Sequence, residues 1–239
     1  MPVKFWKMEK MEPLYMVKIY QLEVTSICNL TCSFCARFPQ WADREHGYMD
    51  LDLIEKIDWS DTEYVELQLA GEPTLHPRFS EIVKRLKAKG LKVGCSTNAT
   101  RPKVDMSQVD IVTCTTDKER DLVLPGKNVY HQKLGENYPY EDVSHKVKFN
   151  LPEVKACTTP FDYVTIHWDG DVLPCCKCFG KQHVFGNLYD QSFKDIINGS
   201  KRAKFLDNMK KGTNYACTYC TVSNPHEIHE HLLDWIDKK

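Results

Sequence analysis

Three cysteines near the start of the chain, Cys28, Cys32 and Cys35, have a spacing typical of metal ligands. The run CNLTCSFC separates them by three and by two residues, and no fourth cysteine lies nearby in the sequence. A closed structural zinc site usually takes four protein ligands, commonly as two C-x2-C pairs. Three thiolates therefore predict a metal centre with one coordination position left open for chemistry.

A second set of cysteines lies in the last third of the chain. The chain has eleven cysteines in 239 residues, and clustered thiols in a reducing compartment favour metal binding over disulfides. Two isolated cysteines, Cys95 and Cys114, sit in apolar segments and are expected to be small buried side chains. The later cysteines fall into two groups, Cys157, Cys175, Cys176 and Cys178, and then Cys217 and Cys220, which are candidate ligands of a second metal site. On their own, four such cysteines are also compatible with a structural zinc ribbon.

Composition and charge exclude several classes of protein. The net charge is −1, with 42% hydrophobic and 27% charged residues, which gives no electrostatic case for binding nucleic acid or an anionic membrane. No apolar run approaches the roughly 18 residues that a membrane-spanning helix needs. The N-terminal segment lacks the apolar stretch and cleavage site of a signal peptide. We therefore expect a cytoplasmic protein with neither nucleic acid nor membrane as a partner.

Strands and helices alternate in the first part of the chain, which indicates a parallel sheet with helical crossovers. The expected strands lie at 17–25, 63–69, 91–96, 110–116 and 128–134, and the expected helices at 51–57 and 77–89. A complete (β/α)8 barrel takes about 250 residues, and little more than half of that precedes Cys157. We therefore predict an α/β fold with a partial, incomplete parallel β/α barrel, whose functional loops follow the carboxyl ends of the strands.

The character of the sequence changes near Cys157. Residues 162–174 (DYVTIHWDGDVLP) predict a hairpin that turns at Asp169-Gly170. Short helices are expected at 192–198, 200–211 and 225–236. This pattern predicts two domains, a partial barrel at 1–150 and a small α+β domain with a C-terminal helix at 151–239, which carries the second set of cysteines.

The cysteine loop after the first strand of a partial barrel resembles the radical S-adenosylmethionine (SAM) superfamily. Phe34 stands where the family usually has an aromatic residue beside the adenine of SAM. The loop after the second strand, Ala70-Gly71-Glu72-Pro73, is similar to the family's GGEP motif, which meets the amino group of SAM. Alanine replaces the first glycine of that motif. The resemblance therefore implies that Phe34, Ala70, Gly71 and Glu72 help to bind SAM.

Two shorter segments extend the resemblance. Ser96-Thr97-Asn98 after the third strand is similar to the family's T-N-G segment, with Ala99 in place of its glycine. After the fourth strand, Thr115 and Asp117 stand where family members offer polar groups to the SAM ribose and carboxylate. The resemblance thus adds Ser96, Asn98, Thr115 and Asp117 to the expected SAM contacts.

The resemblance also implies the cofactors and the chemistry. Three thiolates can hold three irons of a [4Fe–4S] cluster, and SAM chelates the fourth iron. One-electron reduction then cleaves SAM to a 5′-deoxyadenosyl radical, which removes a hydrogen atom from the substrate. No catalytic side chain can be named from the sequence. The alternative that the three cysteines are zinc ligands completed by a distant residue is disfavoured by the AGEP loop.

The second cysteine set resembles the shortened "twitch" form of the SPASM domain of radical SAM enzymes. The Gly170-x4-Cys175 spacing selects Cys175 over its neighbours Cys176 and Cys178 as the ligand beside Cys157. Cys217-x2-Cys220 completes four thiolates, which saturate one auxiliary [4Fe–4S] cluster and favour electron transfer. No cysteine follows Cys220, so we expect no second auxiliary cluster.

The layout is similar to the 2-deoxy-scyllo-inosamine dehydrogenases of aminoglycoside biosynthesis, which oxidise a secondary alcohol. We therefore expect a radical SAM oxidoreductase that dehydrogenates a small polar molecule, with the auxiliary cluster as electron acceptor. The alternative is peptide modification, although only about 16 residues precede the first strand and no peptide-recognition domain is expected there. An alternative of another class is a zinc-stabilised binding module without redox activity. A flavodoxin or ferredoxin is the expected electron donor, for which the basic helix near Lys201, Arg202 and Lys204 is a docking candidate.

Overall fold

The computed structural model of the chain describes residues 19–32, 35, 45–101, 103–116, 128–133, 159–176 and 183–211. These residues form one eight-stranded sheet with short helices. The strands are β1 Ile19–Leu22, β2 Tyr64–Leu67, β3 Lys92–Thr97, β4 Ile111–Thr116, β5 Asn128–Lys133, β6 Tyr163–Ile166, β7 Asp171–Leu173 and β8 Gly186–Asn187. The helices are α1 Asp52–Lys56, α2 Phe79–Ala88, α3 Thr159–Asp162, α4 Phe193–Ile197 and α5 Ser200–Lys210, with a 3₁₀ turn, η1, at Pro73–Leu75.

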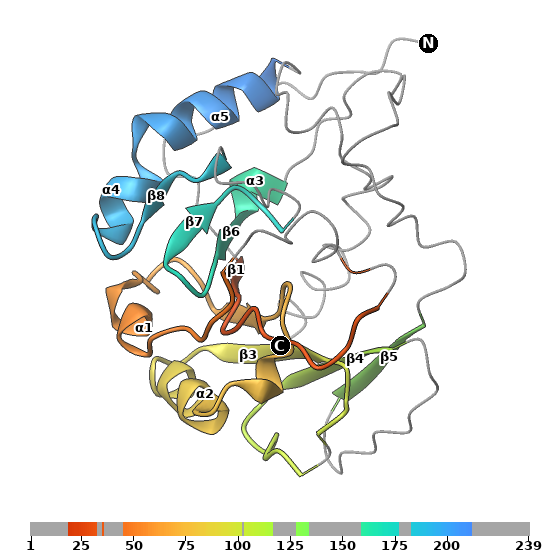
Figure 1. Cartoon of the computed structure of the whole chain (residues 1–239). Helices are drawn as coiled ribbons and strands as arrows, with labels where there is room; N and C mark the ends of the chain where they lie inside the picture. The colour runs from red at the N-terminus through yellow and green to blue at the C-terminus, as the bar shows by residue number, and fades with distance from the viewer. Residues whose placement is uncertain are drawn as a thin grey trace, which may run out of the picture.

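The strand order is β5-β4-β3-β2-β1-β6-β7-β8, and all pairings from β5 to β6 are parallel. Among the described strands β5 and β8 are the two edges, so the sheet curves without closing (Figure 1). Parallel pairing brings the carboxyl ends of β1 to β4 to one edge, where the cysteine and AGEP loops begin. The predicted partial α/β barrel is confirmed.

One face of the sheet is apolar and covered by helices. Alternate residues of the parallel strands, such as Leu22, Leu67 and Val93, join one core cluster with apolar side chains from the helices. α2 contributes Phe79, Ile82, Val83 and Leu86 at helical spacing, and it lies beside α1 along this side of the molecule (Figure 1). Gly90 ends that segment with a φ of +83°, as its predicted role at the helix end requires.

The predicted hairpin is present, but its first strand also extends the barrel. β6 pairs in parallel with β1, with Ile19 beside Tyr163 and Leu22 beside Ile166, while β7 returns antiparallel to β6. Gly170, with a φ of +84°, makes the turn. The hairpin thus shares a sheet with the barrel strands. The predicted domain boundary at 150/151 and the helix at 225–236 lie outside the described residues.

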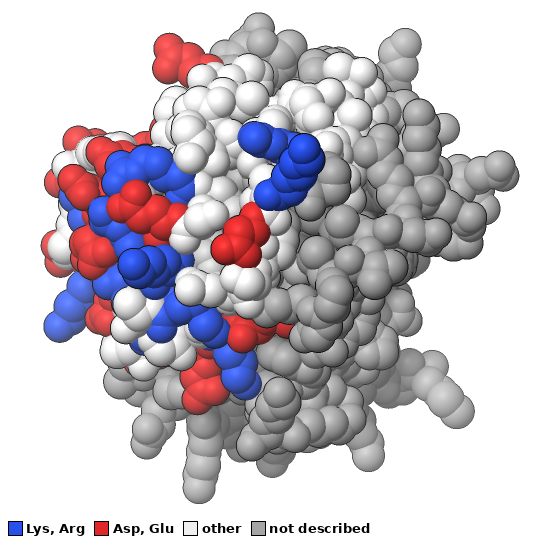
Figure 2. Space-filling model, turned by 90° about the horizontal axis from the view of Figure 1, so that it is seen from below, with Lys and Arg blue, Asp and Glu red and all other residues white. Residues whose placement is uncertain are grey.

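Charges of both signs alternate on the helical side of the molecule. Figure 2 shows Lys and Arg interspersed with Asp and Glu on the side where Figure 1 places α1 and α2. Arg85 lies within ion-pair distance of Glu81, Glu55 and Asp52, and so links α2 to α1. On α5, Lys201 and Lys204 are exposed, whereas Arg202 is only 4% exposed and donates to the Ile197 carbonyl. The predicted basic face of this helix is therefore narrower than its sequence indicates.

None of the described helices is long and apolar enough to cross a membrane.

Candidate functional site

The three cysteines of the first motif lie on the loop that follows β1, and all three are partly exposed. The Cys35 amide donates to the Cys32 carbonyl at 3.0 Å, so these two cysteines lie close together. The base of the loop is held by the segment before α1. The Thr25 hydroxyl donates to the Gly47 carbonyl at 2.7 Å, and the Gly47 amide donates to the Ser26 hydroxyl at 3.0 Å. These bonds hold the start of the loop at the carboxyl end of the barrel.

The AGEP loop packs against the backbone of the cysteine loop. A Cβ at Gly71 would lie 1.9 Å from the Thr25 carbonyl oxygen and 3.0 Å from that of Ile27. The Glu72 amide donates to the Ile27 carbonyl at 2.9 Å. Glycine is therefore required at position 71 because the two backbones touch there. The AGEP loop is therefore in direct backbone contact with the start of the cysteine loop.

Glu72 is buried and accepts four hydrogen bonds within the protein. One carboxylate oxygen accepts from the Thr74 amide at 3.1 Å, the Thr74 hydroxyl at 2.6 Å and the Thr97 hydroxyl at 2.8 Å. The other oxygen accepts from the Asn98 amide at 2.6 Å. A buried carboxylate that receives this many donors is stably held. Glu72 therefore joins the loop after β2 to the loop after β3.

Asn98 continues this network to the cysteine loop. Its side-chain nitrogen lies 3.1 Å from the Asn29 side-chain oxygen and 3.7 Å from Cys28 Sγ. Ala99 follows with a φ of +55°, the left-handed conformation that favours glycine. The family's glycine preference at this position thus has its physical reason in the backbone of this chain. Three loops from β1, β2 and β3 meet at Asn98.

The other residues that were predicted to contact SAM have no described hydrogen bond to the cysteine loop. The Ser96 hydroxyl donates to a Glu66 carboxylate oxygen at 2.9 Å, so it points to the inner face of the sheet. Ala70 is buried beside Gly71 at the start of the AGEP loop. Thr115 lies in β4 opposite Gln132 of β5. Phe34 and Asp117 lie outside the described residues.

A buried carboxyl on the inner face was not predicted from the sequence. Glu66 accepts hydrogen bonds from the Tyr64 and Ser96 hydroxyls, and a Cβ at Gly94 would collide with both Glu66 and Tyr64. Burial raises the pKa of the Glu66 carboxyl from 4.5 to about 7, although both hydrogen bonds lower it. The only signal in the sequence was a glutamate at an inward position of the strand EYVELQL.

His76 serves the loop as a structural side chain. It is 4% exposed, its Nδ1 accepts from the Arg78 amide at 3.0 Å, and its Nε2 lies 3.0 Å from the Met49 carbonyl. Since Nδ1 accepts, Nε2 carries the proton and donates to Met49. Burial lowers the pKa of this imidazole, which favours the neutral ring.

The second cysteine set is described only at its centre. Cys175 and Cys176 follow β7 and are partly exposed. Cys157, Cys178, Cys217 and Cys220 lie outside the described residues. By contrast, Cys95 and Cys114 are buried in the core under the helices, as expected for small apolar side chains.

The donors of the first loop fit an iron–sulfur cluster by their chemistry. Three thiols on one partly exposed loop are soft ligands, which iron–sulfur clusters take. Among the described residues no three Cys, His, Asp or Glu side chains already meet at a metal-binding distance. The fit therefore rests on the donor set and on the loops around it.

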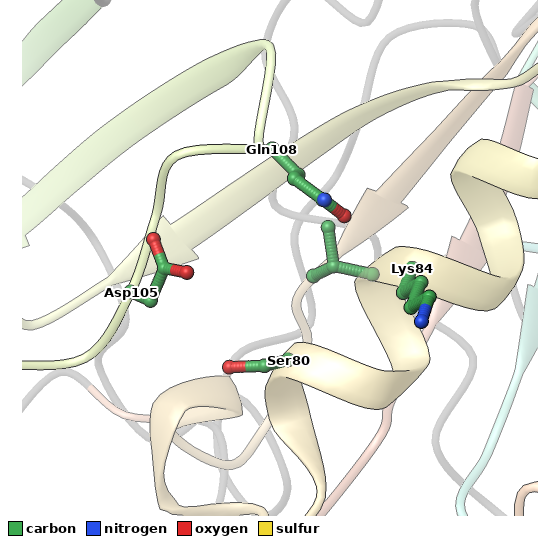
Figure 3. Close-up of a pocket in the computed structure, with 5 residues that line it drawn as sticks. Ser80, Lys84, Asp105 and Gln108 are labelled. Atoms are coloured by element: carbon green, nitrogen blue, oxygen red, sulfur yellow. The ribbon is translucent and has the colours of Figure 1, made fainter.

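A separate hollow lies on the helical side of the sheet. Figure 3 shows Ser80 and Lys84 of α2 and Asp105 and Gln108 of the loop before β4 around it, and Val83 also lines it. The cysteine loop, in contrast, lies at the carboxyl edge of the strands. The hollow is therefore not part of the candidate site.

Two family models match the chain. Residues 22–112 match the model of the radical SAM superfamily, and residues 157–221 match the SPASM iron–sulfur cluster-binding domain. The first match contains the three cysteines and the AGEP loop, and the second contains all six later cysteines, among them the four predicted ligands. The chain belongs to the radical SAM superfamily. A radical SAM protein of this type uses SAM and a [4Fe–4S] cluster, and its SPASM-type segment adds auxiliary iron–sulfur binding.

Two curated relatives of this radical SAM protein are archaeal. The chain is 43% identical over 89 residues to a tungsten-containing aldehyde ferredoxin oxidoreductase cofactor-modifying protein of Pyrococcus furiosus. This match covers 35% of this chain and 24% of that protein. The chain is also 26% identical over 164 residues to a probable GTP 3′,8-cyclase of Pyrococcus horikoshii. This match covers 64% of this chain and 52% of that protein. The matches span from about a quarter to about half of these relatives.

Solved structures show the same fold over most of the chain. BtrN, a 2-deoxy-scyllo-inosamine dehydrogenase crystallised with AdoMet and 2-DOIA, aligns with a TM-score of 0.69 and 21% identity over 90% of this chain and 96% of that one. The structure of anSMEcpe with bound AdoMet aligns with a TM-score of 0.51 and 15% identity over 85% of this chain and 83% of that one. At these identities the likeness shows the fold alone.

Proposed function

We propose that this chain is a radical SAM enzyme in which Cys28, Cys32 and Cys35 hold the catalytic [4Fe–4S] cluster. The observation that carries the proposal is the contact of Gly71 with the Thr25 backbone, because it joins the AGEP loop to the base of the cysteine loop. When bound, the cluster and SAM supply a one-electron cleavage that yields a 5′-deoxyadenosyl radical.

The residues of the chain bind and orient these groups. Gly71 allows the AGEP backbone to reach the cysteine loop, and Glu72 holds that loop against Thr97 and Asn98. Both Glu72 oxygens already accept hydrogen bonds from the protein, so Glu72 would contribute by shaping the AGEP loop, which is proposed to bind SAM. Phe34, Thr115 and Asp117 are proposed to complete the SAM site.

The reaction that we propose is the net oxidation of a small polar molecule. The substrate would lose one hydrogen atom to the 5′-deoxyadenosyl radical, then one proton to a base or to solvent and one electron to an auxiliary [4Fe–4S] cluster, which Cys157, Cys175, Cys217 and Cys220 would hold. The SPASM match over the four later cysteines supports a second cluster. The likeness of fold to BtrN supports a dehydrogenation. The electron donor would be a flavodoxin or a ferredoxin, docked near Lys201 and Lys204.

Iron content and SAM cleavage test this proposal together. Anaerobically purified protein is expected to be brown, to hold about eight irons per chain and to convert SAM to 5′-deoxyadenosine with dithionite. The double variant Cys217→Ala, Cys220→Ala should lose about half of the iron and still cleave SAM. Cys95→Ala is the matched control, because Cys95 is buried in the core and should leave the iron content unchanged. A colourless protein loaded with zinc would refute the proposal.

A second candidate is modification of a cofactor or a peptide. The 43% identity to the P. furiosus cofactor-modifying protein favours it, although the match covers 35% of this chain. A dehydrogenase would release a small molecule that has lost two hydrogens, whereas the second candidate would leave a peptide or a cofactor with a different change in mass. Mass spectrometry of the small-molecule and protein fractions after reaction with cell extract separates the two by the size of the mass change and by the molecule that carries it.

A further inference from the structure

The side chain of Asn98 reaches a predicted cluster ligand from outside the cysteine loop. Its nitrogen Nδ2 lies 3.7 Å from Cys28 Sγ, within reach of an N–H···S hydrogen bond. Asn98 is 9% exposed and follows β3, 70 residues away from Cys28 in the chain. The spacing of the cysteines carries no information about this contact.

A closed ring of hydrogen bonds settles which way the Asn98 amide points. The Thr100 backbone N–H, which can only donate, lies 3.0 Å from Asn98 Oδ1, so the nitrogen must face Cys28. Asn98 Nδ2 donates to Asn29 Oδ1, Asn29 Nδ2 donates to the Thr100 hydroxyl at 2.8 Å, and that hydroxyl donates to Asn98 Oδ1 at 2.6 Å. The first N–H of Asn98 is thereby used within the ring. The second N–H is directed at Cys28 Sγ.

We propose that Asn98 is a positioning residue that donates an N–H···S hydrogen bond to the Cys28 thiolate and raises the reduction potential of the catalytic cluster. This proposal rests on the proposed function, since it requires Cys28 to be a cluster ligand. Reduction adds negative charge to the cluster and its sulfurs, and a hydrogen bond to sulfur stabilises that charge. A higher potential favours transfer of the electron from the donor protein to the cluster, which is the step that loads the site for SAM cleavage.

The contact also couples the cluster to the loop that is expected to hold SAM. The Asn98 backbone N–H holds Glu72, while its side chain holds Cys28. A side-chain substitution removes the contact with sulfur and leaves the backbone bond to Glu72 in place. Side-chain variants therefore separate the effect on the cluster from the effect on the AGEP loop.

The test is a potentiometric titration of the reconstituted protein, in which the EPR signal that responds to added SAM is followed. Asn98→Ala removes the N–H donor without adding charge, and Asn98→Asp keeps the shape and the Oδ1 acceptor but donates no N–H. Both variants are expected to shift the midpoint potential to more negative values, Asn98→Asp further than Asn98→Ala. Thr100→Val is the matched control, because it keeps the Thr100 backbone N–H and the contact of Asn98 with Cys28. Its potential should equal that of the unaltered protein.

The outcomes separate this inference from the proposed function. A midpoint potential that is unchanged in Asn98→Ala and Asn98→Asp at full iron content overturns the inference and leaves the function standing. Iron retained at full content in a Cys28→Ala, Cys32→Ala, Cys35→Ala variant overturns the assignment of the catalytic cluster itself. If neither Asn98 variant holds a cluster, the unaltered protein labelled with ¹⁵N in its asparagine side chains decides. A ¹⁵N coupling to the reduced cluster supports the contact, and its absence overturns it.

Discussion

The two faces of the sheet are built on different physical principles. The outer face is apolar, with Leu22, Leu67 and Val93 packed against α1 and α2. The inner face carries buried polar side chains, among them Gln21, which accepts from the Thr165 hydroxyl at 3.2 Å, and Glu66. Apolar packing has no direction, whereas a hydrogen bond requires a defined donor and acceptor.

The two faces of the sheet therefore contribute differently to stability and to function. Burial of apolar surface on the outer face supplies most of the folding free energy. The polar inner face and the carboxyl edge hold the loops in one arrangement, because each buried polar group needs its own partner. Substitutions on the outer face should therefore change stability first, and those at the carboxyl edge should change SAM cleavage first.

The largest effect is expected at Gly71. In Gly71→Ala the new Cβ collides with the Thr25 carbonyl, so the AGEP loop must move away from the cysteine loop. A displacement of about 1 Å at a reacting centre costs about 100-fold in rate, and we expect at least that loss in the rate of SAM cleavage. Gly90→Ala is the control, since its Cβ meets nothing within 4 Å and only the left-handed backbone is strained. Equal rates in the two variants would contradict the model of touching loops.

Leu67→Ala tests the outer face. Leu67 is completely buried under the helices, and its truncation should lower the free energy of unfolding by about 2–5 kcal/mol. The rate of SAM cleavage at low temperature should stay close to that of the unaltered protein, since no loop contact changes. Urea unfolding followed by circular dichroism measures the first quantity and 5′-deoxyadenosine formation the second. A loss of SAM cleavage without a loss of stability would contradict the assignment of the outer face to stability.

The inner face should make stability depend on pH through Glu66. The pKa of this carboxyl rises on folding from 4.5 to about 7, so the folded state binds more protons than the unfolded state between these values. Stability should therefore fall as the pH rises from about 5 to 7, by at most about 1.4 kcal/mol per pH unit. Glu66→Gln should remove this slope. The free energy of unfolding of both proteins would be measured by urea unfolding between pH 5 and 8. The same dependence on pH in the two proteins would refute this role of Glu66.

Ala99→Gly should give the smallest effect. Ala99 has a φ of +55°, a conformation that costs about 1–2 kcal/mol for a residue with a Cβ. Glycine relieves this strain but loses about 0.5–1 kcal/mol more conformational entropy on folding. We expect a net gain in the free energy of unfolding of about 1 kcal/mol or less, measured by urea unfolding. A clear loss would show that the Ala99 methyl group contributes packing that outweighs the strain.

Much of the fold was predictable because its signals are local. The strands before the cysteine and AGEP loops, helix α2 with Gly90 at its end and the hairpin turn at Gly170 all follow from periodicity and turn residues. The pairing of β6 with β1 was not predictable in this way. This pairing joins segments 144 residues apart, and the periodicity within a strand does not indicate which other strand it pairs with.

The same distinction between local sequence signals and long-range contacts applies to the candidate site. The sequence by itself determined the kinds of chemistry present, since three thiols at Cys28, Cys32 and Cys35 and the AGEP loop are local motifs whose spacing carries their meaning. The ligand roles of these cysteines remain the prediction that iron analysis tests. Only the tertiary structure decided that Gly71 touches Thr25, that Ser96 faces Glu66 and that Asn98 reaches Cys28. The physical reason is that parallel register brings the carboxyl ends of distant strands to one edge, and sequence spacing within a loop does not encode that register.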